Sequence, residues 1–383
     1  MMKILMISGV YKGDKSGVAD YCGHLVDHLR LQGLEVSVAA PAGKEASPQD
    51  RSVELYGWGG ASLYRIMAVI QASNPDIVHL QYQTDIYEAT LFPMRLAREV
   101  RRSGRPLVIT FHDTHGPFLF PRAGRLRKLP LCRFIRNASS LIVSNEGDLA
   151  ELRRLSSILP GAEIIPVGPG IIPTDMPEDE VASLRKEIGA SDAALIGHFG
   201  FIHKAKGLDI LLRSFALASR QMENCRLIII GGLDWKGELA AYKRELEDYA
   251  GRIGINERLL WLPTMPKREA SRYLHICDLM VMPYEDGASG RRSSLFTALA
   301  HGLPVITTYG DNMFAGFSHG ENLWLTDGSS EDIAAGIIKL LSDASARRRI
   351  SEGARRLSGA LSWERIACEH AHIYQALVRS LAS

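Results

Sequence analysis

The feature that most constrains this chain is a series of short apolar segments, each followed by a turn and a helical pattern. In the first half of the chain these segments lie at Lys3–Ser8, Glu35–Ala39, Ile77–Leu80, Leu107–Phe111, Leu141–Ser144 and Glu163–Val167. In the second half they lie at Ala194–Phe199, Arg226–Ile230, Leu259–Leu262, Leu279–Met282 and Pro304–Thr307. Short strands rich in Ile and Val that alternate with helices are typical of parallel sheets buried on both faces. The pattern therefore predicts an α/β chain of two doubly wound, Rossmann-like domains.

The boundary between the two series is predicted at Gly168–Glu180, a segment dense in Pro, Gly and acidic residues. We assign residues 1–175 to an N-terminal domain and residues 176–363 to a C-terminal domain. In doubly wound sheets, ligands bind outside the carboxyl ends of the strands. Each glycine-containing loop after a strand is therefore a candidate site, and two substrates are expected to meet between the domains.

Composition excludes several classes of protein. The 383 residues carry a formal net charge of +2, so bulk charge gives no indication of nucleic-acid binding. No apolar run reaches the roughly 18 to 20 residues of a membrane span, and the N-terminal segment predicts a first strand and not a secretion signal. The five cysteines are widely spaced and lack CxxC pairs, so neither disulfides nor structural zinc are expected. A cytoplasmic location is predicted.

The loop after the first strand of the second domain carries Lys204 and Lys206 just before a helix. A lysine there can reach an anion near the helix N-terminus, where free N–H groups already favour negative charge. The alternative is that both lysines are exposed and only solubilise the loop.

A second loop, after the strand that ends at Met282, contains small residues that let a ligand approach the backbone: Gly287, Ala288, Ser289 and Gly290. Arg291 and Arg292 follow, and Ser293 or Ser294 is expected to cap the next helix. Small residues, two arginines and a helix N-terminus together favour the binding of a diphosphate. Serine caps are also common at helices that bind nothing.

In the first domain, the loop at residues 9–17 opens a helix and lacks GxGxxG, so dinucleotide binding is only weakly indicated. The strand at Leu107–Phe111 delivers His112, Asp113 and His115 at its carboxyl end, where titratable groups are often functional. No third ligand with suitable spacing accompanies the two histidines, so no metal is expected.

Basic and apolar residues are mixed in residues 122–136, and no acidic residue occurs between Thr114 and Asn145. This composition suits the surface of an anionic membrane or a negatively charged acceptor. A solvated helix face is the alternative.

Taken together, the motifs resemble the family-4 retaining glycosyltransferases of the GT-B fold over nearly the whole chain. The resemblance rests on the loop at Ser16–Asp20 and on HLQYQ (79–83), TFHD (110–113), IPVGPGI (165–171), FGFIHKAKGLDILLRSF (199–215) and ALAHGLPVITT (298–308). The final segment resembles the family's closing helix, so residues 364–383 are expected to complete the first domain.

The chain departs from the family pattern at three positions. The family's glutamate pair, eight positions apart, corresponds to Ser289 and Thr297, and its loop arginine corresponds to Phe201. We hypothesise that Arg291 and Arg292 replace the lost guanidinium, that Ser289 and Thr297 still bind hydroxyls, and that Glu285 or Asp286 supplies a carboxylate.

The resemblance implies transfer of a sugar from a nucleotide-diphosphate donor to a saccharide, lipid-linked or other hydroxyl acceptor, without a metal cofactor. The implied catalytic residues are His112, Asp113, Lys206 and Arg292. The implied donor-binding residues are Gly17, Val18, Gly200, Phe201, Lys204, Lys206, Ser289, Gly290, Arg291, Arg292, Ser293, Ser294 and Thr297. The implied acceptor-side residues are Tyr21, Gln81 and His115.

Three alternatives stay open: a nucleotide-sugar epimerase, a non-catalytic nucleotide- or saccharide-binding module, and a nicotinamide dehydrogenase. The absence of GxGxxG counts against the dehydrogenase. The absence of an evident carboxylate pair in the second domain counts against the epimerase.

Overall fold

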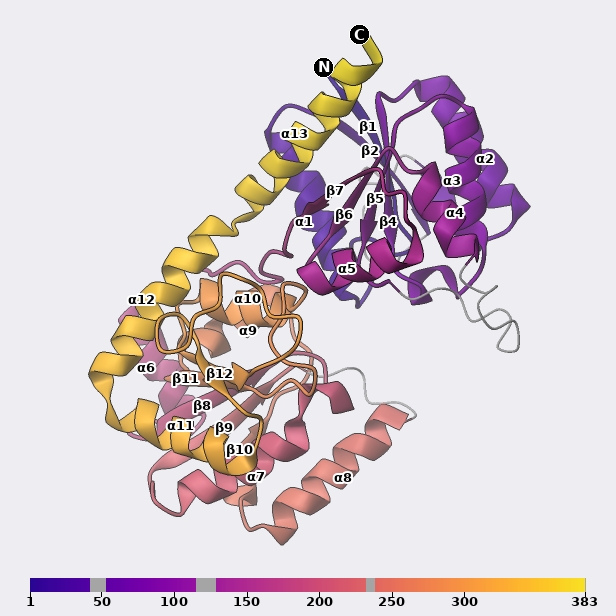
Figure 1. Cartoon of the computed structure of the whole chain (residues 1–383). Coiled ribbons are helices and arrows are strands. Elements are labelled where there is room, and N and C mark those ends of the chain that lie inside the picture. The colour runs from indigo at the N-terminus through magenta and orange to yellow at the C-terminus, as the bar shows by residue number, and fades with distance from the viewer. Residues whose placement is uncertain (42–52, 115–128, 232–237, 383) are drawn as a thin grey trace. The chain divides into compact units, whose positions relative to one another are not determined.

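The computed structural model describes residues 1–41, 53–114, 129–231 and 238–382 (Figure 1). The chain forms two compact units: unit 1 comprises Met1–Gly168 and Ser362–Ser383, and unit 2 comprises Pro169–Leu361. The boundary precedes the predicted one at residue 175 because the N–H groups of Gly170 and Ile171 donate to the Thr297 hydroxyl, at 3.0 and 3.2 Å. These two hydrogen bonds attach the start of the predicted linker to unit 2.

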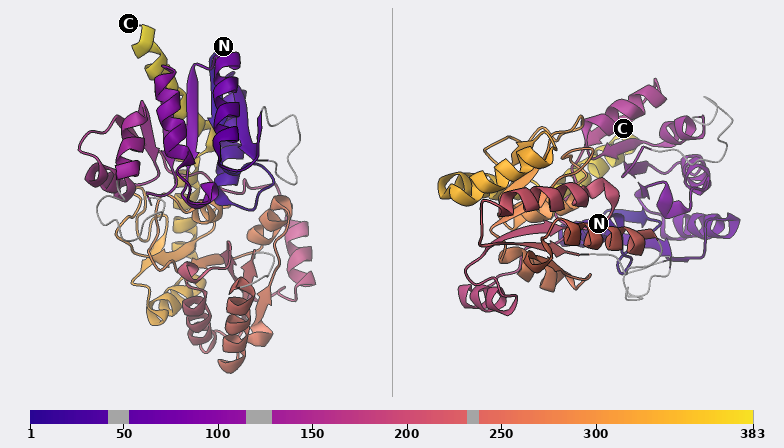
Figure 2. Two further views of the ribbon diagram at one scale, coloured as in Figure 1. Left: turned by 90° about the vertical axis from the view of Figure 1, so that its right-hand side faces the viewer. Right: turned by 90° about the horizontal axis from the view of Figure 1, so that it is seen from below.

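Unit 1 contains a seven-stranded sheet in the order β3-β2-β1-β4-β5-β6-β7, and every neighbouring pair is parallel. The strands are β1 (Lys3–Ile7), β2 (Glu35–Pro41), β3 (Val53–Leu55), β4 (Ile77–Tyr82), β5 (Leu107–Phe111), β6 (Ser140–Val143) and β7 (Gly161–Ile164). The helices are α1 (Gly17–Leu31), α2 (Gly60–Ser73), α3 (Phe92–Arg102), α4 (Leu129–Asn137), α5 (Glu146–Leu155) and α13 (Trp363–Ala382), with a short 3₁₀ turn at Asp85–Tyr87. Helices α2 to α5 pack on one face of the sheet, and α1 with α13 lies on the other (Figures 1 and 2).

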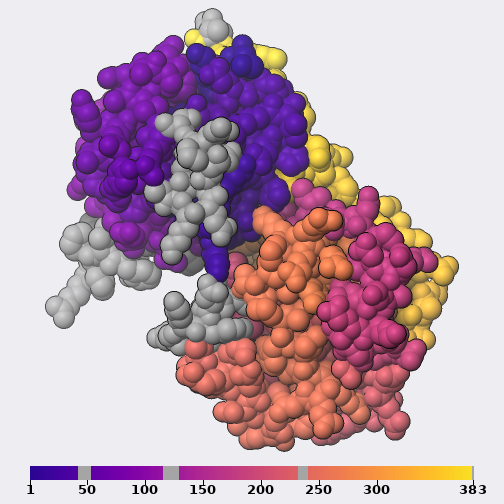
Figure 3. All heavy atoms as spheres, turned by 180° about the vertical axis from the view of Figure 1, so that it is seen from behind, coloured from indigo at the N-terminus to yellow at the C-terminus, as the bar shows by residue number. Residues whose placement is uncertain are grey.

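Helix α13 belongs to unit 1 because of the spacing of its apolar residues. Its buried positions recur every three or four residues, which places them on one stripe: Trp363, Ile366, Ala367, His370, Ala371 and Tyr374. This stripe packs against α1, and in Figure 3 the yellow atoms of α13 border the indigo atoms of the first strands and helix.

Unit 2 contains a six-stranded parallel sheet in the order β10-β9-β8-β11-β12-β13. Its strands are β8 (Ala194–Phe199), β9 (Cys225–Ile230), β10 (Leu259–Trp261), β11 (Leu279–Met282), β12 (Val305–Thr308) and β13 (Trp324–Thr326). Its helices are α6 (Glu178–Glu187), α7 (Leu208–Ser219), α8 (Glu238–Arg252), α9 (Lys267–His275), α10 (Ser293–Ala300), α11 (Ser330–Ser342) and α12 (Ala344–Ala360). Side chains of α7, α8 and α11 form a core cluster with β8, β9 and β11.

The structure also differs from the sequence expectation in the predicted linker and at two edge strands. The acidic end of the predicted linker is the first turn of α6, where Glu178, Asp179 and Glu180 are favoured by the helix dipole. The edge strands β3 and β13 were not predicted, because each has three residues and too little apolar sequence to give a strand pattern.

Two glycines of α12 test the packing of unit 2. A methyl group added at Gly353 would lie 2.0 Å from the Glu321 carbonyl oxygen, whereas one added at Gly359 meets nothing within 4 Å. Replacing a helical glycine by alanine normally stabilises a helix by ~0.5–1 kcal/mol. We therefore expect Gly359→Ala to raise, and Gly353→Ala to lower, the free energy of unfolding measured in urea. Equal effects of the two substitutions would contradict this packing.

Candidate functional site

The sheet of unit 2 has a switch point between β8 and β11. From β8 the chain builds outward through β9 and β10, and from β11 it builds in the opposite direction through β12 and β13. At such a point the connections leave towards opposite faces, and a crevice opens beyond the carboxyl ends of the two strands. Here the loop at 200–207 follows β8, and the loop at 283–292 follows β11.

These two loops are in direct contact. The Glu285 N–H donates to the Ala205 carbonyl at 3.3 Å. Gly207 has φ +63°, and a methyl group there would lie 2.1 Å from the Pro283 carbonyl oxygen, so only glycine fits. Gly200 has φ +140° and lies against Ser294. The close approach fixes the position of Lys206 relative to the second loop.

The centre of the site is the ring of Tyr284, which is 1% exposed. The Lys206 ammonium lies 4.8 Å from the ring centroid, and the Arg292 guanidinium carbon lies 4.5 Å from it. The Tyr284 hydroxyl is 2.9 Å from the Ser294 hydroxyl, and this contact fixes the ring. Two cations therefore share one aromatic platform, and each gains a cation–π interaction from it.

The positive charge of this pair is incompletely balanced. Asp286, whose side chain is 58% exposed, forms an ion pair with Arg292. In the part of the chain that the structure describes, Lys206 has no carboxylate partner. Burial, followed by repulsion from Arg292, lowers the pKa of Lys206 to about 8. Burial also lowers the pKa of Arg292 from its ordinary value. An anion placed beside both side chains would relieve this cost.

Predicted residues around helix α10 take different roles. Ser289 is 3% exposed, and its hydroxyl has no partner among the described residues, so it is available to a ligand. The Thr297 hydroxyl instead donates to the Ser293 carbonyl at 2.9 Å and accepts the two N–H groups of the linker. Its hydrogen-bonding capacity is therefore used within the fold.

The expected serine cap of α10 is wrong. The N-cap residue is Arg292, and no side chain caps the helix there. The Ser294 hydroxyl contacts Tyr284, and the Ser293 hydroxyl faces Gly170, where an added methyl group would lie 2.7 Å from it.

The remaining predicted residues of unit 2 line the same loops. Lys204 is exposed, and its ammonium lies 5.8 Å from the ring of Tyr242, so it is not part of the Tyr284 cluster. Phe201 is 37% exposed, Gly290 is buried, and Arg291 is partly buried.

Sequence reasoning missed Tyr284 and His198. Tyr284 follows a strand directly and stands between the two cationic segments, which is the only signal it offers. His198 is fully buried, its Nδ1 lies 2.9 Å from the Val281 carbonyl, and its Nε2 has no partner among the described residues. Burial, opposed by the contact with the Val281 carbonyl and assisted by the nearby Lys206, lowers the pKa of His198 to about 4, so the imidazole is neutral at pH 7.

In unit 1, the corresponding switch point lies between β1 and β4. His112 follows β5, and its Nε2 lies 2.9 Å from Oε1 of the fully buried Gln81. The Tyr21 ring meets the His112 ring edge to face at 4.8 Å, and the Tyr21 hydroxyl lies 3.1 Å from Nε2 of His370 on α13. The structure thus brings together the predicted residues His112, Gln81 and Tyr21.

Other predicted residues of unit 1 have local roles. Asp113 is 9% exposed and accepts hydrogen bonds from the Thr84 N–H and hydroxyl, both at 3.1 Å, so it holds the turn after β4. The Val18 N–H donates to the Ser16 side chain at 3.3 Å, which caps α1, and Gly17 is exposed with open space around it. His115 lies outside the described residues.

The basic segment at 122–136 is described only from Leu129 onward. There, the apolar residues of α4 (Leu131, Phe134 and Ile135) are buried in the core of unit 1. Among the described helices, none combines the length and apolar character of a membrane span.

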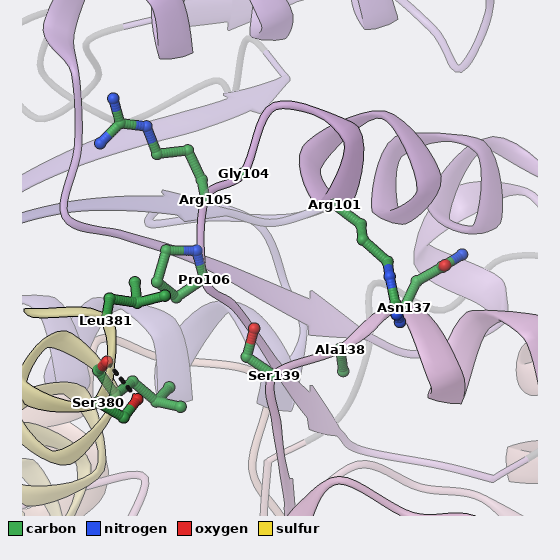
Figure 4. Close-up of a pocket in the computed structure, with 10 residues that line it drawn as sticks. Arg101, Gly104, Arg105, Pro106, Asn137, Ala138, Ser139, Ser380 and Leu381 are labelled. Atoms are coloured by element: carbon green, nitrogen blue, oxygen red, sulfur yellow. Dashed lines mark hydrogen bonds between the residues drawn. The ribbon is translucent and has the colours of Figure 1, made fainter. Parts of the chain in front are cut away.

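A pocket of about 400 Å³ lies in unit 1 at the amino ends of β5 and β6, beside the end of α13 (Figure 4). Its Arg101 donates to the Arg136 carbonyl, and its Arg105 donates to the Pro75 carbonyl and to Asn74. The arginines therefore stabilise the fold. The pocket lies at the amino ends of the strands, whereas His112 lies at the carboxyl end of β5.

Comparison with protein families gives two matches. A model described as glycosyl transferases group 1 matches residues 181–357, and one described as a glycosyl transferase 4-like domain matches residues 16–170. Curated relatives include D-inositol 3-phosphate glycosyltransferases. The enzyme of Corynebacterium urealyticum is 26% identical over 64% of this chain and 58% of its own length. The enzyme of Mycobacterium marinum is 25% identical over 92% of this chain and 79% of its own length. The chain matches about half the length of the first relatives, 45% to 58%.

Solved structures share the fold. HepE of Anabaena, solved with UDP, superposes with a TM-score of 0.77 at 19% identity, over 98% of this chain and 100% of its own. Sucrose-phosphate synthase of Thermosynechococcus elongatus superposes with a TM-score of 0.78 at 18% identity, over 99% of this chain and 100% of its own. The two parallel-sheet units are those of the GT-B fold.

The hydrogen bonds of Thr297 predict a stability effect that needs no ligand. Thr297→Val keeps the shape of the side chain but leaves the Gly170 and Ile171 N–H groups without their acceptor, which costs about 1–3 kcal/mol. We expect a lower melting temperature of the unliganded protein for Thr297→Val, whereas Thr297→Ser keeps the hydroxyl and most of the stability. Wild-type stability of the valine variant would show that these bonds contribute little.

Proposed function

Because this chain belongs to the family-4 glycosyltransferases of the GT-B fold, we propose that it transfers a sugar from a nucleotide-diphosphate donor to a hydroxyl acceptor with retention of configuration. The observation that carries the proposal is the pair of cations on the Tyr284 ring, at the switch point where α/β sheets bind ligands. Related proteins support it: HepE was solved with UDP-glucose, and the curated relatives are named for transfer to an inositol phosphate.

In the proposed reaction the diphosphate binds between Lys206 and Arg292. Cleavage of the bond from the sugar to the diphosphate builds negative charge on the leaving group. Two cations fixed in advance stabilise that charge more in the transition state than in the ground state, which is the usual dominant contribution to catalysis. The same cations supply the positive charge for which other enzymes use a metal ion, so the proposal includes no metal.

The acceptor oxygen bonds to the anomeric carbon from the face that the diphosphate leaves, and its proton passes to the departing diphosphate oxygen, so the anomeric configuration is retained. Ser289, whose buried hydroxyl has no partner among the described residues, is proposed to hydrogen-bond a hydroxyl of the donor. His112 is proposed to face the sugar. We further propose that the acceptor is a saccharide phosphate or a lipid-linked saccharide, and that the transfer takes place at the cytoplasmic face of a membrane.

A non-catalytic nucleotide-binding module is the second candidate. It is favoured by the resemblance, which aligns Ser289 and Thr297 with the family's glutamates, and by the internal hydrogen bonds of Thr297. Donor binding with neither transfer nor hydrolysis, across a panel of saccharide and saccharide-phosphate acceptors, would favour this candidate.

The first test is a thermal-shift titration with UDP, GDP, ADP, CDP and dTDP. A ligand at about 100 times its dissociation constant stabilises the native protein by roughly 2.7 kcal/mol. We expect one nucleotide to raise the melting temperature and Lys206→Met to weaken its binding about 30-fold, as loss of a charge-assisted hydrogen bond predicts. Lys204→Met is the matched control, because the Lys204 ammonium lies over the ring of Tyr242 and not of Tyr284. Its effect on nucleotide affinity should be several-fold smaller. No shift with any nucleotide would contradict the proposal.

The depressed pKa of Lys206 predicts how donor binding depends on pH. The ammonium form binds the diphosphate, and a pKa of about 8 means that this form is lost as the pH rises through 8. The nucleotide itself keeps its charge, because the last phosphate pKa is about 6. Binding measured by calorimetry should therefore weaken about tenfold between pH 7 and pH 9. Lys206→Met should bind weakly with no change over this range; a flat wild-type profile would mean that Lys206 is not the group that binds.

A further inference from the structure

A chain of hydrogen bonds runs through unit 1 from helix α13 to the carboxyl end of β5. The Tyr374 hydroxyl lies 2.6 Å from Nδ1 of His79. Nε2 of His79 lies 3.1 Å from Nε2 of Gln81, and Oε1 of Gln81 lies 2.9 Å from Nε2 of His112. Tyr374, His79 and Gln81 are fully buried, so water does not compete for these contacts.

The orientation of the Gln81 amide follows from its second neighbour. Its Nε2 lies 3.2 Å from the Met6 thioether sulfur, as well as 3.1 Å from Nε2 of His79. A thioether sulfur only accepts hydrogen bonds, and an amide NH₂ offers two hydrogens. The NH₂ group therefore donates to both neighbours, and the amide oxygen points to His112.

This orientation decides where the imidazoles carry their hydrogens. Nε2 of His79 accepts from Gln81, and the Thr110 hydroxyl lies 2.8 Å from the same nitrogen, so the hydrogen of His79 is on Nδ1 and is donated to Tyr374. The amide oxygen of Gln81 can only accept, so His112 donates to it through Nε2–H. The lone pair of His112 is left on Nδ1, which has no hydrogen-bond partner among the described residues.

The histidines involved are neutral, so the question is one of tautomer and not of charge. Burial, with the nearby His370, lowers the pKa of His112 to about 3 and that of His79 well below its ordinary value. Burial lowers the pKa of His370 to about 4. At neutral pH each ring therefore carries one hydrogen, whose position is set by its partners.

We infer that Gln81, itself oriented by His79 and Tyr374, is a positioning residue that fixes His112 as the Nε2–H tautomer and presents Nδ1 as a hydrogen-bond acceptor. His112 then selects a ligand group that donates a hydrogen bond, which is a sugar or acceptor hydroxyl and not a phosphate oxygen. Only this identification of the ligand group rests on the proposed function, because the tautomer is a property of the unliganded protein.

The direct test is a long-range ¹H–¹⁵N correlation spectrum of the full chain labelled with ¹⁵N-histidine, without substrate. His112, assigned from His112→Gln, should show a protonated Nε2 and an unprotonated Nδ1, and His79 should show the reverse. The opposite pattern at His112 would overturn the inference.

Three variants test the chain of contacts. Gln81→Met removes both amide groups at similar volume, and both tautomers of His112 should then appear. Gln81→Glu keeps an oxygen acceptor for Nε2–H and should retain the wild-type tautomer. Tyr374→Phe removes the acceptor of His79 but keeps the ring, and it should also mix the tautomers of His112. An unchanged His112 spectrum in Gln81→Met would refute the positioning role.

The matched control is Tyr87→Phe. Tyr87 is a fully buried tyrosine of the same unit, and its hydroxyl donates at 2.8 Å to the main-chain carbonyl of Gln81, outside the side-chain network. It should leave the His112 spectrum as in the wild type. Mixed tautomers in this control would show that any buried hydroxyl has the same effect.

Activity separates this inference from the proposed function. Gln81→Met should lower kcat/KM for glycosyl transfer about tenfold, equivalent to one hydrogen bond in the transition state, and leave the affinity for UDP unchanged. An unchanged kcat/KM would overturn the role of Nδ1 in selecting a hydroxyl. Failure of every nucleotide to bind would contradict the proposed function, while the tautomer result would stand.

Discussion

The reversal in strand order between β8 and β11 determines where unit 2 can hold a ligand. Parallel strands need crossover helices, and the helices on the two sides of the reversal leave towards opposite faces of the sheet. The loops that follow β8 and β11 are then the ones that meet. Their contact is so close that a side chain at Gly207 would overlap the backbone of the other loop, which gives Lys206 and Arg292 a fixed separation.

The aromatic platform explains how two like charges remain together when the described residues place no buried carboxylate beside them. Tyr284 offers each cation the negative face of its ring, and Asp286 balances only Arg292, from an exposed position. The stabilisation is incomplete, as the lowered pKa of Lys206 shows. In the unliganded protein the site therefore carries positive charge that nearby carboxylates only partly balance. A bound diphosphate would balance it, so the packing of Tyr284 between the two cations leads directly to the proposed donor binding.

The sequence predicted the two sheets and the location of the cationic residues, because strand spacing and glycine loops are local signals. It did not predict the role of Thr297, whose partners lie more than 120 positions away and become neighbours only in the folded unit. It also missed Tyr284 and the contacts of Gln81 with His79 and Tyr374. An aromatic after a strand, or a glutamine within one, has the same local appearance whether it packs, caps or orients a catalytic group. The serine cap of α10 failed for the same reason, since Ser294 is engaged by Tyr284.

The place of α13 has a consequence for how the chain folds during synthesis. Unit 1 requires residues 362–383, and these are made only after all of Pro169–Leu361. At ribosomal rates of about 5–20 residues per second, the first part of unit 1 waits roughly 10–40 s for its last helix. Throughout that interval the face of α1 that receives α13 is uncovered, and His79 lacks Tyr374. The strands of unit 1 are thus made first, but this unit receives its last helix only after the whole of unit 2 has been made, so the first domain along the sequence is the last to be completed.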